Sequence, residues 1–272
     1  MGKNNQSTQE MNSQVQNPLG IAPVGGLIAK FAIPAIISML VSAMYNIVDQ
    51  IFIGQGVGML GNAATNVAFP VTTIATALAL LLGIGGASNY NLEMGAGYEE
   101  KASGIAGTAL SSLVSGGVIL AAIILLFLKP LLTLFGATAD VMPYAVDYTG
   151  ITALGLPFYI LSVGGNHIVR ADRSPTYSMV CIMIGAIINT ILDPLFIFGF
   201  GWGIKGAAWA TVIGQVASGV LVIVYFCKFR KMYLSGGMLK PKLSYLKPPR
   251  RRRQAPRSTA RPARCRQSRT AE

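Results

Sequence analysis

Six apolar stretches, each long enough to cross a lipid bilayer, dominate this chain of 272 residues. A membrane-spanning helix needs about 20 mostly apolar residues. The stretches cover residues 27–53, 63–87, 102–128, 145–169, 176–200 and 207–229. Because lipid offers the backbone no hydrogen bonds, apolar segments of this length cross it as helices. The sequence therefore predicts an all-α membrane protein built as a six-transmembrane-helix bundle.

The charge of the chain supports the same fold class. Charged residues make up 12% of the sequence, about half of the ~25% found in ordinary soluble domains. The net charge of +12 is concentrated at one end, since 15 of the 22 Lys and Arg residues lie in residues 228–272. No nucleophile–base pair, metal cluster or phosphate-binding loop stands out, so we expect neither an enzyme nor a bound cofactor.

The distribution of Lys and Arg predicts the orientation, because cytoplasmic loops of membrane proteins are enriched in positive residues. With the amino terminus inside, six spans leave only Lys129 and Lys205 on the outer side. The inner side then receives Lys3, Lys30, Lys101, Arg170, Arg173 and the basic tail. We expect a multi-pass protein of the plasma membrane with both termini cytosolic. It has a flexible leader over 1–24, a six-helix lobe over 25–230 and a basic, disordered tail over 231–272.

The last 25 residues differ in kind from the rest. Residues 248–272 contain nine Arg and no Lys, and they lack Leu, Ile, Val and Phe. One hypothesis is a changed reading frame that truncates or replaces the native carboxyl end. The alternative is a polybasic segment that binds anionic lipid. We expect no nucleic-acid partner, because the tail shows no aromatic interleaving and no folded module.

Two carboxylates, Asp49 and Asp193, lie inside otherwise apolar spans. An Asp at the centre of a membrane helix costs ~2.5–3.5 kcal/mol, so such residues usually face a bundle interior or a watery cavity. The first and fifth spans run in the same direction, which places both residues in the outer half of the membrane. A purely structural alternative remains: Asp193 could cap a helix break at Pro194, and Asp49 could face water at the rim.

Further oxygen-bearing side chains fall at the same depth. Asn189 precedes Asp193 by four residues and shares its helix face. Thr211 lies near the outer start of the sixth span and shares a face with Ala207. Carboxylate, amide and hydroxyl oxygens suit a hard cation, and two carboxylates can also share a proton. The sequence predicts a proton or sodium site without choosing between the two ions, and sodium is the only metal expected.

Three motifs resemble the multidrug and toxic compound extrusion (MATE) family, over about residues 25–232. The first span and its continuation read IPAIISMLVSAMYNIVDQIFIGQGVGMLGNAATNVAFP. The exit of the fourth span, NHIVRADRSPTYSM, is similar to the family's Arg-Ala-acid-Gly-x-Pro turn. The fifth and sixth spans, NTILDPLFIFGFGWGIKGAAWAT, resemble its Asn-x-x-x-Asp-Pro helix and the Gly-Ala-Ala-x-Ala-Thr that follows.

The resemblance implies multidrug efflux by proton- or sodium-coupled antiport. The family's amino-terminal cation site then falls on Asp49, Asn189, Asp193 and Thr211, with Ala207 beside it. The expected partners are amphipathic organic cations or drugs and the lipid bilayer.

Other residues are candidates for the substrate pathway. Asn166 matches a polar position of the family's fourth helix, and Tyr45 and Tyr148 are able to line a drug cavity through cation–π contacts. Anchoring at the membrane interface is the alternative role for the tyrosines. His167, the single histidine, is interpreted as an interfacial or capping residue.

Two departures from the family pattern affect this interpretation. Arg173 stands where the family's turn has Gly, which suggests a backbone conformation that Arg would strain. The family has twelve spans in two lobes, whereas this sequence matches one lobe, so it resembles a half-transporter that needs a second lobe or copy. The alternatives are an inert or scaffolding membrane fragment, or a lipid-linked saccharide flippase. A flippase would favour a basic cavity, and these spans contain almost no Lys or Arg.

Overall fold

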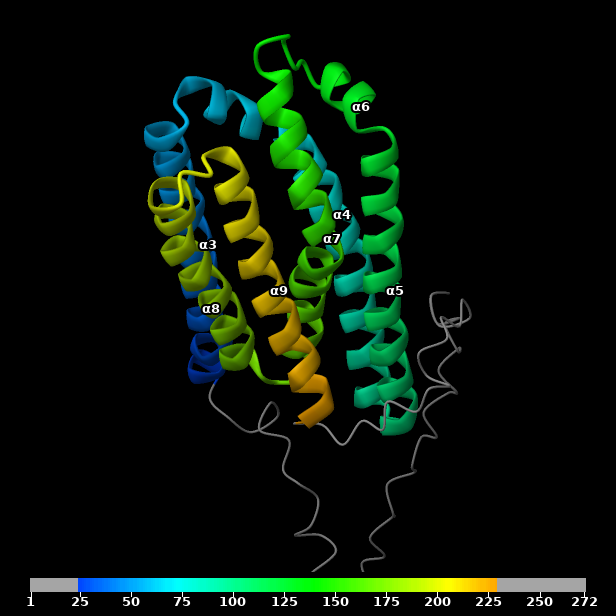
Figure 1. Cartoon of the computed structure of the whole chain (residues 1–272). Helices are drawn as coiled ribbons and strands as arrows, with labels where there is room; N and C mark the ends of the chain where they lie inside the picture. The colour runs from blue at the N-terminus through cyan, green and yellow to red at the C-terminus, as the bar shows by residue number, and fades with distance from the viewer. Residues whose placement is uncertain (1–23, 229–272) are drawn as a thin grey trace, which may run out of the picture.

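The computed structural model describes residues 24–228, which are almost entirely helical. The long helices are α3 (Val24–Gly56), α4 (Met59–Gly95), α5 (Glu99–Leu126), α7 (Met142–Ala171), α8 (Pro175–Pro194) and α9 (Ile204–Lys228). A short helix, α6 (Leu128–Leu134), joins α5 to α7, and a π-helical turn, η1 (Leu195–Gly199), continues α8. Figure 1 shows the long helices running side by side as one bundle.

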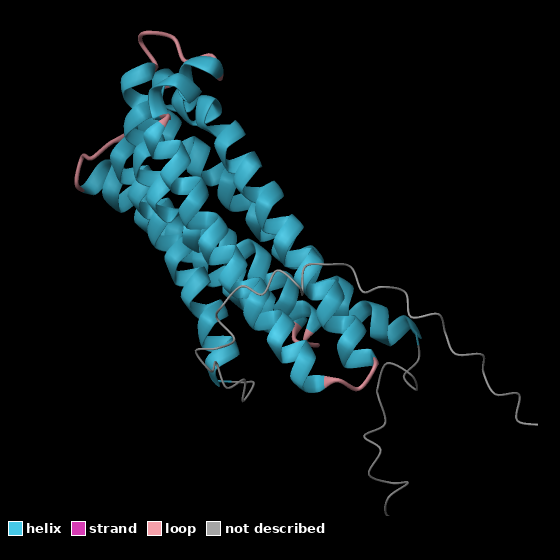
Figure 2. Ribbon diagram, turned by 90° about the vertical axis from the view of Figure 1, so that its right-hand side faces the viewer, coloured by secondary structure: helices cyan, strands magenta, loops and turns pink. Residues whose placement is uncertain are grey.

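Six of these helices are long and apolar enough to cross a membrane. Residues 24–228 contain no strand, as Figure 2 also shows. Both findings confirm the predicted fold class. The start of α3 and the end of α9 lie at the same end of the bundle, as an even number of crossings requires (Figure 1). Nearly all of the expected leader and the whole of the expected tail lie outside the described residues.

Helix α7 lies in the middle of the bundle, and α4, α5, α8 and α9 surround it (Figure 1). Its inward side chains form the main core with those of its neighbours; Ile160, Leu113 and Val222 are fully buried there. By contrast, α3 packs mainly on α8 and only sparsely on α4. The bundle is therefore solid on the side of α5 and less closely packed between α3 and α4.

Small residues let the helix backbones approach closely. A Cβ placed on Gly83 of α4 would lie 2.5 Å from the Cα of Gly164 in α7. Between α8 and α9, a Cβ on Gly185 would lie 2.9 Å from the carbonyl oxygen of Gly214. Because lipid gives no hydrophobic drive for helices to associate, such close backbone packing is a main source of cohesion in membrane bundles.

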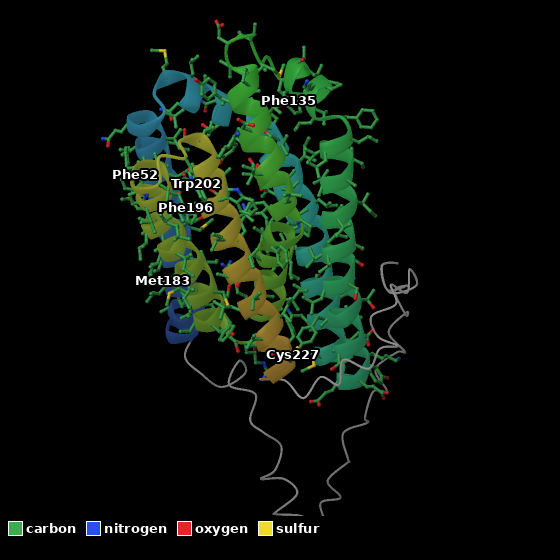
Figure 3. All side chains as sticks on the ribbon, viewed as in Figure 1. Phe52, Phe135, Met183, Phe196, Trp202 and Cys227 are labelled. Atoms are coloured by element: carbon green, nitrogen blue, oxygen red, sulfur yellow. The ribbon has the colours of Figure 1, made fainter. Side chains whose placement is uncertain are left out.

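Aromatic side chains gather at the end of the bundle where η1 leads into α9 (Figure 3). The rings of Phe196 and Trp202 lie 5.3 Å apart, and the rings of Phe200 and Trp202 lie 5.5 Å apart. Phe200 and Trp202 are more than half exposed. Exposed aromatic rings at a helix end are typical of the membrane–water interface.

The turn between α7 and α8 closes the opposite end of the bundle. Asp172 is buried there, and its carboxylate accepts hydrogen bonds from the hydroxyls of Tyr90 in α4 and Tyr225 in α9. The next residue, Arg173, has φ 63°, the single positive value at a non-glycine residue within 24–228. The prediction that this position needs a glycine-like backbone conformation is confirmed.

Candidate cation site and cavity

The candidate site begins on α3. Tyr45 and Asp49 are four residues apart and therefore lie on one face of the helix. That face turns into the bundle, because Asp49 is only 7% exposed in a helix whose other faces are largely exposed. Ile53 and Ile197, each four residues further along the chain, pack in one apolar cluster, so Asp49 of α3 and Asp193 of α8 lie at the same level of the bundle.

Helices α8 and α9 supply the other predicted residues. The amide nitrogen of Asn189 donates to Oδ1 of Asp193 over 3.3 Å and to Oγ1 of Thr211 over 3.5 Å. Asp193 is fully buried and Asn189 is 3% exposed. Pro194 follows Asp193 directly and ends α8, so the carboxylate lies at the junction with the π-helical turn. The structure thus brings Asp49, Asn189, Asp193 and Thr211 together.

Three oxygens of this group have no hydrogen-bond partner among residues 24–228. They are Oδ1 of Asp49, Oδ1 of Asn189 and Oδ2 of Asp193, and all three are buried. Buried polar atoms are nearly always satisfied in folded proteins, so each exception calls for a reason. Three such oxygens on neighbouring side chains are the ligand type that a hard cation prefers.

A cavity of ≈ 710 Å³ opens beside this group, between α3, α4, α7, α8 and α9. Asp49, Asn189 and Thr211 lie on its wall, whereas Asp193 is behind the wall and reaches it through Asn189. Ala207 does not line the cavity; it packs with Ile53 and Ile197 in a small apolar cluster. Ala207 therefore lies among the apolar contacts around the site and offers no group to the cavity.

All three predicted pathway residues line this cavity: Tyr45, Tyr148 and Asn166. Tyr148 and Asn166 are both in α7, eighteen residues or about five turns apart, so the cavity extends along much of that helix. Asn166 is 2% exposed and donates to the carbonyl oxygen of Ser162 over 2.8 Å. Its own Oδ1 has no partner among the described residues.

Sequence reasoning missed several polar residues of the cavity. Among them, Gln50 pairs with Thr65 and Ser162 with Ser218, each across two helices. Thr76 pairs with Tyr159, a tyrosine that, like Tyr45 and Tyr148, is able to line a drug cavity. Gln215 also lines the cavity, and its side-chain oxygen has no partner within residues 24–228. Gln215 follows the predicted site residue Thr211 by four positions and so lies on the same helix face. This spacing is the one sequence signal that could have identified Gln215.

His167 and Arg170 also line the cavity, at the end away from Asp49. The interpretation of His167 as an interfacial or capping residue stays a prediction. The Nε of Arg170 donates to Oγ of Ser178 over 2.9 Å, and this hydrogen bond holds the Arg170 side chain against α8. The cavity thus has carboxylates at one end and basic side chains at the other.

A six-span helical bundle with a polar cavity in its interior defines a multi-pass membrane protein. The particular family follows from comparison: the MatE family model matches residues 34–195. The chain belongs to this family, which confirms the resemblance of its motifs.

Relatives and solved structures agree with this assignment. The multidrug export protein MepA of Staphylococcus aureus is 30% identical over 207 residues, which are 76% of this chain and 46% of MepA. An outward-facing multidrug resistance MATE family transporter superposes with a TM-score of 0.70 at 29% identity, covering 75% of this chain and 45% of that one. A Pyrococcus furiosus transporter of the MOP superfamily gives a TM-score of 0.71 at 30% identity over 76% and 45%. The chain spans about half the length of the relatives it matches.

Proposed function

We propose that this chain forms one lobe of a multidrug exporter driven by proton or sodium antiport. The observation that carries the proposal is the set of buried, unpartnered oxygens on Asp49, Asn189 and Asp193 beside a large polar cavity. The relatives named multidrug export proteins support the substrate class. Amphipathic organic cations are the expected substrates, because the carboxylate of Asp49 lies on the cavity wall together with Tyr45 and Tyr148.

The proposed coupling follows from competition for negative charge. A sodium ion would bind to the carboxylate, amide and hydroxyl oxygens of Asp49, Asn189, Asp193 and Thr211, and a proton would be shared by the two carboxylates. Either ion neutralises the charge that attracts an organic cation in the cavity. Uptake of the ion therefore favours release of the drug, which is the exchange that antiport requires.

The aromatic and polar walls of the cavity would guide the substrate. Tyr45 and Tyr148 are near the carboxylates, where their ring faces can bind an organic cation at ~0.5–2 kcal/mol per contact. Asn166 offers a hydrogen-bonding oxygen further along the cavity. Access from alternate sides of the membrane requires a second body, either a second lobe or a second copy of this lobe. The distribution of Lys and Arg favours cytosolic termini.

The cation site can be tested without drug transport. The chain has two Trp residues, and Trp209 precedes Thr211 by two positions in α9. We expect sodium or a pH change to alter the tryptophan fluorescence of the purified full chain. Asp49→Asn and Asp193→Asn should abolish that response, while the control Asp140→Asn, which changes an exposed carboxylate, should keep it.

A second measurement tests export itself. Full chain reconstituted in vesicles should move a cationic dye against an imposed sodium or proton gradient, and both site variants should be inactive. If the ion response is present but dye transport is absent, the chain is an inert lobe that lacks its second body. A wild-type chain without any ion response contradicts the proposed site.

A further inference from the structure

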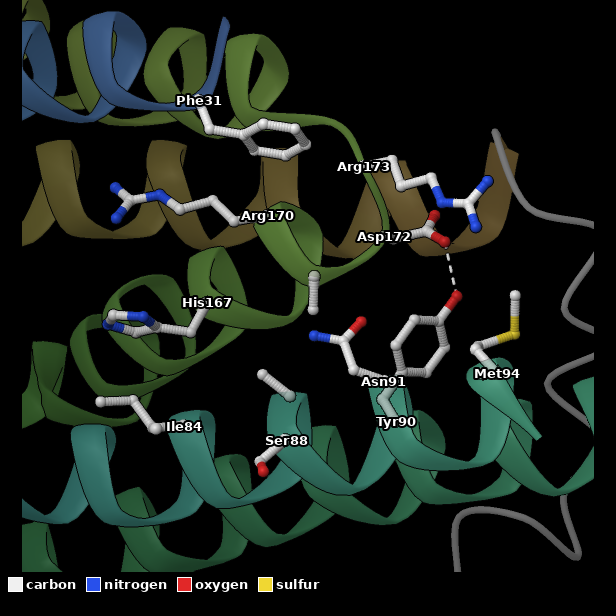
Figure 4. Close-up of a pocket in the computed structure, with 13 residues that line it drawn as sticks. Phe31, Ile84, Ser88, Tyr90, Asn91, Met94, His167, Arg170, Asp172 and Arg173 are labelled. Carbon is white, nitrogen blue, oxygen red and sulfur yellow. Dashed lines mark hydrogen bonds between the residues drawn. The ribbon is translucent and has the colours of Figure 1, made fainter. Parts of the chain in front are cut away.

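A second pocket, of ≈ 720 Å³, lies at the end of the bundle where the α7–α8 turn is found. Figure 4 shows it between the last turns of α4, the end of α7 and the start of α3. Its α4 wall is one helical face, formed by Ile84, Ala87, Ser88, Asn91 and Met94. This pocket shares only His167 and Arg170 with the cavity of the candidate cation site.

The charge of this pocket is opposite to that of the cation site. Arg170 and Arg173 both line it, and Asp172 is its one acidic residue. The two carboxylate oxygens of Asp172 already accept hydrogen bonds from Tyr90 and Tyr225. Within residues 24–228, the one ion pair is Lys205 with Asp147, so neither arginine is paired with an acidic side chain there. The pocket therefore presents cationic donors that the described residues do not neutralise.

Its polar groups are spread along an apolar wall. In Figure 4 the guanidinium groups of Arg170 and Arg173 extend toward opposite ends of the pocket. Ser88 and Asn91 are exposed between them, and Phe31, Ile84 and Met94 supply apolar surface. An elongated anion joined to an apolar chain fits this arrangement better than a compact free ion does.

The depth of the pocket indicates the same kind of ligand. Helix α4 has 37 residues, so at 1.5 Å per residue it is ~55 Å long, well beyond the ~30 Å hydrocarbon core. The pocket lies along the last three turns of this helix, where lipid headgroups are found. Basic pockets between membrane helices on the cytoplasmic side are known to bind phosphate-bearing headgroups.

We propose that this pocket binds the elongated, phosphate-bearing headgroup of an anionic membrane lipid, with Arg170 and Arg173 contacting oxygens at its opposite ends and Asn91 and Ser88 adding hydrogen bonds between them. Arg guanidinium groups suit phosphate oxygens because they donate two parallel, charge-assisted hydrogen bonds. This site differs from the candidate cation site, since it uses neither Asp49 nor Asp193, although Arg170 and His167 line both the pocket and the cavity.

The experiment uses the full chain in detergent, with phosphatidylglycerol and phosphatidylcholine of identical acyl chains as probes. Native mass spectrometry should show several-fold stronger retention of phosphatidylglycerol. The double variant Arg170→Gln, Arg173→Asn should weaken that retention about tenfold or more. The single variant Arg173→Asn should weaken it less; Asn tolerates the left-handed backbone of this turn, so the fold is kept.

Two comparisons make the result decisive. Lys129→Gln removes one positive charge from an exposed site outside the pocket and should leave lipid retention unchanged. Inorganic phosphate and glycerol phosphate, added in a thermal unfolding assay, distinguish a free anion from a lipid. Arginine-dependent stabilisation by these ions without lipid retention would assign the pocket to a soluble phosphate. Equal binding of both lipids, or equal loss in Lys129→Gln, together with no stabilisation by either ion, overturns the proposal.

Discussion

Two buried carboxylates at opposite ends of the bundle have very different surroundings. Asp172 is 8% exposed, and both of its oxygens accept hydrogen bonds from buried tyrosine hydroxyls. Asp193 is fully buried, and one of its oxygens has no partner among the described residues. Asp49, which lies beside Asp193, likewise has an unpartnered oxygen.

The difference separates a structural carboxylate from a candidate binding carboxylate. Asp172 joins α4, α9 and the α7–α8 turn through bonds that are complete in the folded chain. Asp193 and Asn189 make one long hydrogen bond of 3.3 Å and retain free acceptor capacity. A carboxylate that is buried without enough partners lowers stability unless it binds something. Substitution should therefore cost much more stability at Asp172 than at Asp193.

The largest effect is expected for Asp172→Ala. Removing this carboxylate takes away an acceptor shared by the buried hydroxyls of Tyr90 and Tyr225, although Tyr225 keeps its contact of 2.8 Å with Oγ of Ser174. We expect the free energy of unfolding to fall by about 3–5 kcal/mol. Denaturant unfolding of the detergent-solubilised chain measures this change. Asp140→Ala, at an exposed position, is the control and should change it by less than about 0.5 kcal/mol. Equal stability of the two variants would show that Asp172 has no structural role.

Tyr90→Phe and Tyr225→Phe test the same group from its donor side. Each change removes one hydroxyl and keeps the ring, which is 2% exposed in Tyr90 and 4% exposed in Tyr225. We expect each variant to lose about 1.5 kcal/mol, since a hydrogen bond to a charged group contributes on that order. In the background of Asp172→Ala, Tyr90→Phe should have a much smaller effect, whereas Tyr225→Phe still removes the hydrogen bond between Tyr225 and Ser174. Full additivity in this double-mutant cycle would rule out a shared hydrogen-bonded group.

Asp193→Asn should affect stability much less than Asp172→Ala, although Asp193 is more deeply buried. The change removes a charge whose burial is only partly compensated, so we expect the free energy of unfolding to shift by less than about 1 kcal/mol. Sodium should stabilise the wild-type chain in a thermal unfolding assay and leave Asp193→Asn unaffected. A loss as large as that of Asp172→Ala would place Asp193 in the structural class instead.

The smallest effect, and the opposite sign, is expected for Arg173→Gly. A left-handed backbone costs a non-glycine residue ~1–2 kcal/mol, so Gly relieves that strain. The greater entropy of Gly in the unfolded chain offsets part of this gain. The net result should be a stabilisation of about 0.5 kcal/mol, seen as a higher thermal midpoint. Arg173→Val should be destabilising at the same position. A drop in stability for the Gly variant would show that the arginine side chain itself holds the turn.

The sequence predicted the helices and part of the cation site well. Span length and apolar composition are sufficient to place six helices, because the bilayer fixes their minimum length. Asn189 and Asp193 could be placed on one face from their spacing, and the rarity of membrane carboxylates pointed to Asp49. The rest of the site could not be found this way. Helices that face lipid are apolar on most sides, so the sequence does not show which face of each helix points into the bundle.

Contacts between residues far apart in the chain were the other feature that the sequence could not predict. The hydroxyl of Tyr90 meets Asp172 across 82 residues, and that of Tyr225 does so across 53. No local pattern marks these pairs, because each tyrosine alone resembles an interfacial aromatic residue. The same limit applies to His167: its place near a helix end was evident from the sequence, but its position on the cavity wall was not.

The glycine contact between α8 and α9 has a consequence for ion size. A Cβ on Gly214 would lie 2.8 Å from the carbonyl oxygen of Gly185 and 3.2 Å from the Cβ of Asn189. Asn189 and Thr211 are within about one turn of this contact, so the gap between their oxygens follows the helix spacing that the glycines permit. Alanine at Gly214 would widen that gap by a few tenths of an ångström and shift any selectivity from smaller toward larger ions. At the proposed cation site, Gly185 and Gly214 would thereby limit the radius of the ion that fits, although neither offers it a side-chain ligand.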